Sequence, residues 1–503
     1  MQPRHFALLI LAPFALHAED ASSGSAAKDA AGELFAARYD RAAELYSALL
    51  HSDPAWGAGY YGSVRALIGA RRAPEAYAAA EDGLRHAPDS AEGQTAAGLA
   101  AYRRGDLPHA EAYFRKAREI DAHYAYAPSG LASIYNAVSK FKTGQALAAQ
   151  AWRAAPSDPR LMVEWASSLQ GAEHIAALER ALALYDPSSR EAVSLRAHIA
   201  SDKAAGGRKL RRLVSPYRSY DVQLVPIGVG RHVYAVGLRV RFNDAHAVRL
   251  MLDTGAGGIS LSTKAAEKAG LESLSGESAE FKGLGDRKPQ EAFAYLASSV
   301  SVGDIRFADF PVEASKAADD PDYDGLIGAD VFRQFQVTVD FQKPRLILSP
   351  YSDGQPGDQA LDAQDPLPAG FARMFRFGHI LAVETSINQR PPQLFVVDSG
   401  WTANLIDSGA AQESTKVRRD YNSGLTGLQG RLDQVSRAAK VSLIFAGFRQ
   451  DNSDLLATSL EGLADAKGVS FAGILGMPVL WQMKMTIDYR AGALRFERIG
   501  AGK

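Results

Sequence analysis

The spacing of hydrophobic and polar positions changes near Ala205. From Ala30 to about Ile199 the chain is rich in Ala, Leu, Tyr and Arg and has almost no β-branched runs, which favours helices. Beyond that point apolar and polar residues alternate with a period of two, as in Val233–Phe242 and Ile380–Ile387. This alternation predicts half-buried β-strands. We therefore expect an all-α region followed by an all-β region.

Prolines in the helical region recur in phase. Pro54, Pro88 and Pro156 fall at multiples of one interval, and Ala122 holds the place between the last two. A proline ends the second helix of a pair before the next pair begins, and a period of this length, about 34 residues, is typical of tetratricopeptide repeats. Small and aromatic packing residues of the repeat stand at Ala42, Tyr46, Gly98, Ala110, Phe114 and Ala117. We expect a tetratricopeptide-like solenoid, and an irregular Ala-rich bundle stays open as the alternative.

Two apolar strands end in the same kind of turn. Val248–Leu252 leads into the Asp-Thr-Gly triplet 253–255, and Leu394–Val397 leads into the Asp-Ser-Gly triplet 398–400. A carboxylate directly after a buried strand is costly unless it is paired or hydrogen-bonded. Two such acids suggest that they pair with each other.

The repetition continues beyond the triplets. Gly328 closes an apolar element downstream of Asp253, and Gly476 closes a similar element at nearly the same spacing after Asp398. A strand ending in Asp and then a charged turn with a last strand follow in both series, at Val337–Asp340 and Met485–Asp488. The sequence therefore predicts one fold unit present twice.

These motifs resemble the aspartic peptidase superfamily, specifically the retropepsin-like domains of bacterial aspartyl proteases, arranged as two lobes in one chain as in pepsin-like enzymes. The resemblance covers about Val222 to Glu497. It implies a multidomain chain whose helical solenoid precedes a bilobal all-β domain. The expected boundaries are a signal peptide at 1–18, helical repeats at 19–204, a linker at 205–220, lobe 1 at 221–351, a connector at 352–370 and lobe 2 at 371–503.

The resemblance also implies the chemistry of an aspartic-type endopeptidase. Asp253 and Asp398 would share one proton, because like charges about 3 Å apart cannot both ionise, and would activate a water to hydrolyse a peptide bond. Thr254 and Ser399 are similar to the hydroxyl residues that hydrogen-bond across the lobe interface. Gly255 and Gly400 would let the backbone approach the carboxylates.

Two glycine-rich stretches are similar to the flaps of retropepsin-like domains, and ordinary hairpins are the competing interpretation. The first is Gly283, Leu284 and Gly285, and the second is Gly424, Leu425, Thr426 and Gly427. Trp401 departs from the family pattern, in which a small residue is usual after the triplet. An indole there would narrow the cleft, form a specificity wall, or mark lobe 2 as structural. The alternative function is thus an inactive protease-like peptide-binding protein that recruits a partner through the helical repeats. Pairing of two chains through one lobe each is unnecessary, because one chain carries both lobes.

Composition limits the kinds of partner and chemistry that the chain can have. With 503 residues, a net charge of −1 and 22% charged residues, the chain splits into about three domains and has no field that favours nucleic acid. The absence of cysteine excludes disulfides and thiol nucleophiles. The 11 histidines show no metal-binding spacing such as H-E-x-x-H, so we expect neither a metal nor another cofactor.

The first residues have the features of a secretory signal peptide. Basic residues precede an apolar run from Phe6 to Leu16, and Ala18 offers a cleavage position. No other run is long enough for a membrane span. We expect a periplasmic or secreted bacterial monomer that acts on peptides or proteins, with a possible protein partner on the helical repeats. The basic stretch Gly206–Arg212 in the linker is interpreted as a solvated hinge without a function.

Overall fold

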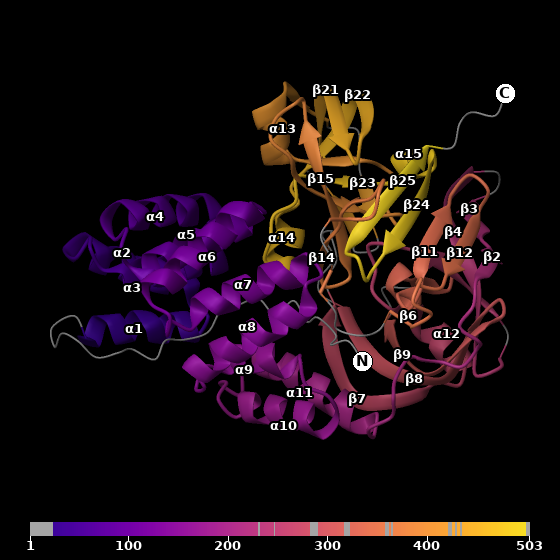
Figure 1. Ribbon diagram of the computed structural model, residues 1–503, viewed down its shortest axis with the longest axis horizontal. Coiled ribbons are helices and arrows are strands. Elements are labelled where there is room, and N and C mark those ends of the chain that lie inside the picture. The colour runs from indigo at the N-terminus through magenta and orange to yellow at the C-terminus, as the bar shows by residue number, and fades with distance from the viewer. Residues whose placement is uncertain are drawn as a thin grey trace. The chain divides into compact units, whose positions relative to one another are not determined.

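The computed structural model describes residues 24–229, 232–245, 247–281, 290–315, 322–357, 362–363, 366–420, 425–427, 430–432 and 435–498. Its contacts divide the chain into two compact units. Of the described residues, a helical unit holds 24–196 and 464–470, and a β unit holds 197–463 and those from 471 onward. Figure 1 shows the N-terminal part as coiled ribbons and most of the remaining chain as arrows. The expected signal peptide lies outside the described residues.

The helical unit consists of consecutive helices that pack against their neighbours in the chain. They are α1 (Gly24–Phe35), α2 (Tyr39–Ser52), α3 (Gly57–Gly69), α4 (Ala73–His86), α5 (Ala91–Arg104), α6 (Leu107–Ile120), α7 (Tyr126–Ala137), α8 (Phe141–Ala154), α9 (Pro159–Ala166), α10 (Gly171–Leu182) and the first part of α11 (Arg190–Ala204). Within the described ranges, no helix combines the length and the apolar character that crossing a membrane requires.

Small residues allow these helices to approach closely. Phe114 of α6 is 2% exposed, and a Cβ atom added to Gly98 of α5 would lie 2.7 Å from its ring. Ala110 and Ala117, on the same face of α6, are fully buried. Side chains longer than hydrogen at position 98 would push α5 and α6 apart. The helical nature of this region is therefore confirmed, and its membership of the tetratricopeptide family stays a prediction.

Lobe 1 of the β unit is a mixed sheet with the order β1-β9-β6-β10-β5-β4-β8-β7, and β3 adds to β4. Its strands are β1 (Arg212–Leu213), β3 (Val225–Val229), β4 (His232–Phe242), β5 (Val248–Leu252), β6 (Ile259–Ser262), β7 (Glu272–Phe281), β8 (Gln290–Val302), β9 (Ile305–Ser315) and β10 (Gly325–Ile327). The β4–β5 hairpin turns at Asn243 and Asp244, whose φ angles of 48° and 59° are left-handed. Asn and Asp tolerate that conformation best among non-glycine residues.

Lobe 2 repeats this topology with the order β14-β15-β16-β23-β17-β22-β21-β18, and β19 pairs with β20 separately. Its strands are β14 (Phe375–Phe377), β15 (Ile380–Ile387), β16 (Gln393–Val397), β17 (Leu405–Asp407), β18 (Val417–Arg419), β19 (Leu425–Gly427), β20 (Gly430–Leu432), β21 (Ser436–Phe445), β22 (Phe448–Thr458) and β23 (Gly473–Leu475). In both lobes the glycine-element strand runs parallel to the strand before the aspartate, β10 beside β5 and β23 beside β16. Short helices follow β6 and β17, namely α12 (Thr263–Lys268) and α13 (Ser408–Ser414).

A third sheet joins the lobes, with the order β13-β25-β24-β11-β12-β2. It contains β2 (Tyr220–Gln223), β11 (Gln336–Asp340), β12 (Arg345–Ser349), β13 (Ala372–Arg373), β24 (Met483–Asp488) and β25 (Ala493–Arg498). Its centre is the antiparallel β11–β24 pair, where the buried hydroxyl groups of Thr338 and Thr486 lie 2.9 Å apart. One hydrophobic core continues through both lobes and this sheet. The lobes are therefore held to each other by main-chain hydrogen bonds as well as by packing.

The predicted fold class is confirmed, because a helical region precedes a two-lobed β region. Local predictions also agree: β5 covers the expected Val248–Leu252, and β16 covers the expected Leu394–Val397 and begins one residue earlier, at Gln393. Residues 205–220, expected to be a linker, include β1, which pairs with β9 in lobe 1. The domain boundaries as a whole stay a prediction.

The packing of α5 against α6 predicts a large cost for shortening Phe114. We expect Phe114→Ala to lower the free energy of unfolding by about 3–5 kcal/mol, because it removes a buried ring and leaves a cavity. Urea unfolding followed by circular dichroism at 222 nm measures this. Lys116→Ala on the exposed face of α6 is the matched control, and equal stabilities of the two variants would show that the ring does not hold these helices together.

Candidate active site

Asp253 and Asp398 lie at equivalent places in the two lobes. Asp253 follows β5, and its backbone N–H donates to the Ile327 carbonyl oxygen of β10 at 3.0 Å. Asp398 follows β16, and its N–H donates to the Leu475 carbonyl oxygen of β23 at the same distance. A parallel neighbour thus fixes the backbone of each aspartate where its strand ends. The motif that is repeated in the sequence therefore has the same backbone geometry in both lobes.

The two loops exchange hydrogen bonds across the lobe interface. The Thr254 hydroxyl donates to the Val397 carbonyl oxygen at 2.8 Å, and the Ser399 hydroxyl donates to the Leu252 carbonyl oxygen at 2.8 Å. In return each hydroxyl oxygen accepts from the other residue's backbone N–H, at 3.1 Å from Thr254 and 3.0 Å from Ser399. Both residues are 1% exposed. Since buried hydroxyls need partners, the pair fixes the loops against each other.

Glycine is required where each loop meets the opposite carboxyl group. A Cβ atom added to Gly255 would lie 2.5 Å from Cγ of Asp398, and one added to Gly400 would lie 2.6 Å from Cγ of Asp253. Both distances are far below van der Waals contact, so a side chain at either position would displace a carboxyl group. The carboxyl groups themselves are joined by a side-chain hydrogen bond. The structure therefore brings together all six residues of the two triplets.

The glycines of the later elements lie under the same loops. A Cβ atom on Gly328 would lie 2.5 Å from the Ala256 carbonyl oxygen, and one on Gly476 would lie 2.8 Å from the Trp401 carbonyl oxygen. Gly328 N–H donates to the Gly258 carbonyl oxygen at 2.8 Å, whereas Gly476 N–H donates to Oδ1 of Asn404 at 2.9 Å. The two loops thus rest on similar elements through different acceptors. Asn404 is buried and was not singled out from the sequence, where a lone Asn gives no signal.

The Oδ1 atoms of the two aspartates accept different numbers of backbone hydrogen bonds. Oδ1 of Asp253 accepts from the N–H groups of Gly255 at 2.8 Å and Ala256 at 3.1 Å. Oδ1 of Asp398 accepts from Gly400 N–H at 2.8 Å. The next N–H donates to the aspartate backbone carbonyl in both loops, from Ala256 at 3.2 Å and from Trp401 at 3.3 Å, and only Ala256 N–H reaches the side chain as well. Hydrogen bonds to a carboxylate favour its ionised form. Asp253 is therefore better equipped to carry the negative charge.

Burial and this asymmetry set the proton distribution. Asp253 and Asp398 are 7% and 8% exposed, and burial raises the pKa of both. For Asp398 the charge of Asp253 and the hydrogen bond to it raise the pKa further, to well above its usual range, and the N–H groups of Gly400 and Gly255 oppose this rise. For Asp253 the same hydrogen bond and the two N–H donors oppose the rise in pKa. The pair therefore holds one proton between its carboxyl groups at a pH where two separate aspartates would both be ionised.

The expected flaps are only partly described. Gly283, Leu284, Gly285 and Gly424 lie outside the described residues. Leu425, Thr426 and Gly427 form β19, which pairs with β20 so that Gly427 stands opposite Gly430. The described part of the second stretch is therefore one strand of an antiparallel pair, and its role as a flap stays a prediction. In lobe 1, β7 and β8 pair up to Phe281 and Gln290, on either side of the first stretch.

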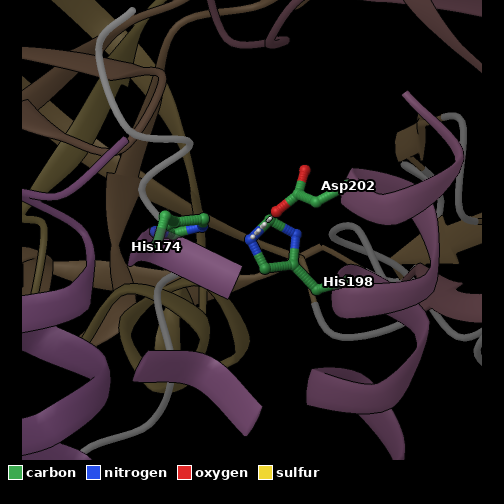
Figure 2. A group of neighbouring side chains, drawn as sticks. All are labelled: His174, His198 and Asp202. Carbon is green, nitrogen blue, oxygen red and sulfur yellow. Dashed lines mark ion pairs between the residues drawn. The ribbon is translucent and has the colours of Figure 1, made fainter. Parts of the chain in front are cut away.

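Residue types that bind metals also occur in α11. His198 Nε2 lies 3.3 Å from a carboxylate oxygen of Asp202, one turn further along the helix (Figure 2). His174, drawn in the same view, belongs to the helical unit, and its Nδ1 lies 2.8 Å from the Ala166 carbonyl oxygen. Protein zinc sites use three or four side-chain ligands. His198 and Asp202 alone are too few ligands for such a site, so we describe them as an ion pair and assign no metal to them.

Comparisons with known proteins bear on the β unit. Residues 238–331, which contain Asp253 and the first glycine element, match the family model described as "Aspartyl protease". A solved structure, the aspartic proteinase from Irpex lacteus, aligns over 56% of this chain and 98% of its own with 12% identity and a TM-score of 0.38. No curated protein has a sequence that matches this chain. The family match supports an aspartyl protease domain in the β unit.

The raised pKa of Asp398 predicts a pH-dependent gain in stability from Asp398→Asn. The unfolded chain releases this proton near pH 4, whereas the folded chain keeps it to higher pH, so stability falls as the pH rises toward the folded pKa. Asn keeps the shape and cannot ionise. We expect the variant to have a higher melting temperature than the wild type at pH 7, by about 2–4 °C for each kcal/mol gained. At pH 3 the two melting temperatures should be nearly equal.

Differential scanning calorimetry at the two pH values measures this difference. Asp304→Asn, at an exposed position, is the matched control. A lower melting temperature for Asp398→Asn at pH 7 would mean that the pair is stabilised by its charge rather than by its proton.

Proposed function

We propose that this protein is an aspartic endopeptidase that hydrolyses peptide bonds with a water activated by Asp253 and Asp398. The observation that carries the proposal is the buried pair of carboxyl groups, hydrogen-bonded to each other and supplied with unequal donors. The family match over residues 238–331 supports the same class.

We assign the role of base to Asp253, whose Oδ1 accepts from two backbone N–H groups, and the role of acid to Asp398, whose Oδ1 accepts from one. The Asp253 carboxylate takes a proton from the attacking water while the water oxygen bonds to the scissile carbonyl carbon. Asp398 donates its proton to the carbonyl oxygen, so the tetrahedral intermediate is neutral. Collapse of that intermediate returns a proton to Asp398, breaks the C–N bond and passes the proton held by Asp253 to the leaving nitrogen. The pair then has its starting single proton again.

Trp401 is the residue that favours the alternative function, an inactive protease-like peptide-binding protein. Its backbone is held by the glycine element of lobe 2, since its carbonyl oxygen accepts from Met477 N–H at 2.8 Å. The neighbouring Ser399 and Gly400 keep their hydrogen bonds to the opposite loop and to Asp398. These contacts support the enzyme, with Trp401 as a wall of the substrate site.

Substrates would be peptides or proteins bound in an extended form, with main-chain hydrogen bonds resembling strand addition. The periplasmic or secreted location, the monomeric state and a protein partner on the helical repeats also stay predictions from the sequence. None of them is needed for the chemistry of the carboxyl pair.

Each aspartate should be indispensable for turnover. Asp253→Asn and Asp398→Asn keep the shape of the side chain but cannot share one proton correctly, so we expect each to lower kcat by about 10²–10⁴-fold. Hydrolysis of an unstructured protein, with and without pepstatin, measures this on purified chain, and circular dichroism checks the fold. Asp304→Asn is the control. Full activity of Asp398→Asn would show that lobe 2 is structural, and an inactive wild type would favour the binding protein.

The enzyme should work best in mildly acidic to near-neutral solution. Pepsin-like enzymes usually carry a hydroxyl residue directly after the triplet, which lowers the carboxylate pKa, whereas this chain has Ala256 and Trp401 there. Burial raises the pKa of both aspartates, so protonation of Asp253 sets the acidic limb and loss of the Asp398 proton sets the alkaline limb. A pH profile of kcat/KM tests this, and Ala256→Ser should move the acidic limb to lower pH. An optimum near pH 2 in the wild type would contradict the argument.

A further inference from the structure

Arg211, in the segment expected to be a solvated hinge, is built into lobe 1. Its backbone has a φ of 56°, which is uncommon outside glycine and costs free energy. Two hydrogen bonds hold this conformation: Arg211 N–H donates to the Asp309 carbonyl oxygen at 2.9 Å, and Gln334 Nε2 donates to the Arg211 carbonyl oxygen at 3.1 Å. The chain then continues directly into β1, which pairs with β9.

The side chain of Arg211 reaches the neighbourhood of the Asp253 loop. It is 20% exposed, and its guanidinium lies over the ring of Phe310 at 5.4 Å. Nη1 lies 3.6 Å from Oδ2 of Asp330, whose side chain is 14% exposed. An ion pair with both members largely withdrawn from water is screened much less than a surface pair. Removing Arg211 takes away the cation that contacts Asp330, which then keeps its interaction with the charge of Arg376.

Asp330 connects this ion pair to the end of the Asp253 loop. Its Oδ1 accepts from Gly258 N–H at 2.7 Å, and Gly258 closes the loop that begins at Asp253. Gly258 has a φ of 65°, and a Cβ atom added there would lie 3.3 Å from Nη2 of Arg211. The guanidinium, the Asp330 carboxylate and the end of the loop are thus in mutual contact. Asp330 stands two residues after Gly328, in the element that also supports the loop.

The corresponding part of lobe 2, which the structure describes, is built differently. Pro478 occupies the place two residues after Gly476, and the neutral side chain of Asn404 accepts from Gly476 N–H at 2.9 Å. A neutral amide can serve as an acceptor without a cation, whereas a half-buried carboxylate needs one. Arg211 therefore meets a requirement that arises at the loop carrying Asp253.

We propose that Arg211 and Asp330 are positioning residues that hold the loop 253–258, and with it the Asp253 carboxylate, in its reactive place. The catalytic consequence rests on the proposed peptidase function, and the positioning itself does not. A displacement of about 1 Å in a reacting group costs up to about 10²-fold in rate, so loosening this loop should act on kcat.

The kinetic test compares Arg211→Ala with Arg212→Ala, since Arg212 is exposed and lies 3.9 Å from Asp309 instead. We expect Arg211→Ala to lower kcat by about 10- to 10²-fold with KM nearly unchanged, and Arg211→Lys to restore part of the loss. Asp330→Asn keeps an acceptor for Gly258 but not the charge, so combining it with Arg211→Ala should add little further loss. Equal kcat in the two arginine variants, or fully additive losses, would overturn the proposal.

Hydrogen–deuterium exchange separates this proposal from the proposed function. In Arg211→Ala, peptides covering residues 254–258 should exchange faster than in the wild type, while peptides covering residues 399–404 stay unchanged. Arg212→Ala should alter neither. Unchanged exchange at 254–258, or the same increase in both loops, would refute the positioning role even in an active enzyme. An inactive wild type whose loop still loosens in Arg211→Ala would refute the peptidase function alone.

If Arg211→Ala fails to fold, Arg211→Lys and Asp330→Asn supply the same comparison. Faster exchange confined to residues 254–258 in Asp330→Asn would support the proposal, and its absence in both variants would overturn it.

Discussion

The structure of the β unit depends on the burial of two carboxyl groups that face each other. Both are buried, and two ionised carboxylates in such close contact would repel strongly in a medium less polar than water. The pair is tolerated because one proton joins the groups and backbone N–H groups point at the remaining charge. Gly255 and Gly400 leave the space that this approach needs, and the Thr254–Ser399 exchange fixes both loops.

Duplication supplies a symmetric frame, and side chains that differ between the lobes make the site unequal. Strand order, the parallel β5–β10 and β16–β23 pairs and the central Thr338–Thr486 contact are nearly the same on both sides. Against this frame, Ala256 N–H donates to its aspartate side chain and Trp401 N–H does not. Because general acid–base chemistry needs one proton donor and one base, the inequality has chemical value. Perfect symmetry would leave the two roles undifferentiated.

Much of this arrangement follows from local sequence. A period of two and a triplet directly after an apolar run predict β5 and Asp253 in lobe 1, and the second copy predicts β16 and Asp398. The pairing of the two acids follows from the physical cost of burying each alone. By contrast, nothing local indicates that Arg211 meets Asp330, since the two are far apart in the sequence and each has many possible partners. A basic stretch resembles a solvated hinge in sequence, because a run of charges does not indicate which residues of the folded chain it contacts.

The contact between Arg211 and Asp330 also bears on which residues belong to lobe 1. The hydrophobic pattern places its start at about residue 221, where β2 enters the sheet that joins the lobes. The electrostatic and main-chain contacts place it before Arg211, since the turn at Arg211 is bonded to Asp309 and Gln334 and β1 pairs with β9. A chain cut between these points would keep both aspartates and both glycine elements while removing the Arg211 guanidinium from the Asp330 carboxylate. The loop that carries Asp253 therefore depends on residues of the β unit that precede β2, in a way that the loop carrying Asp398 does not.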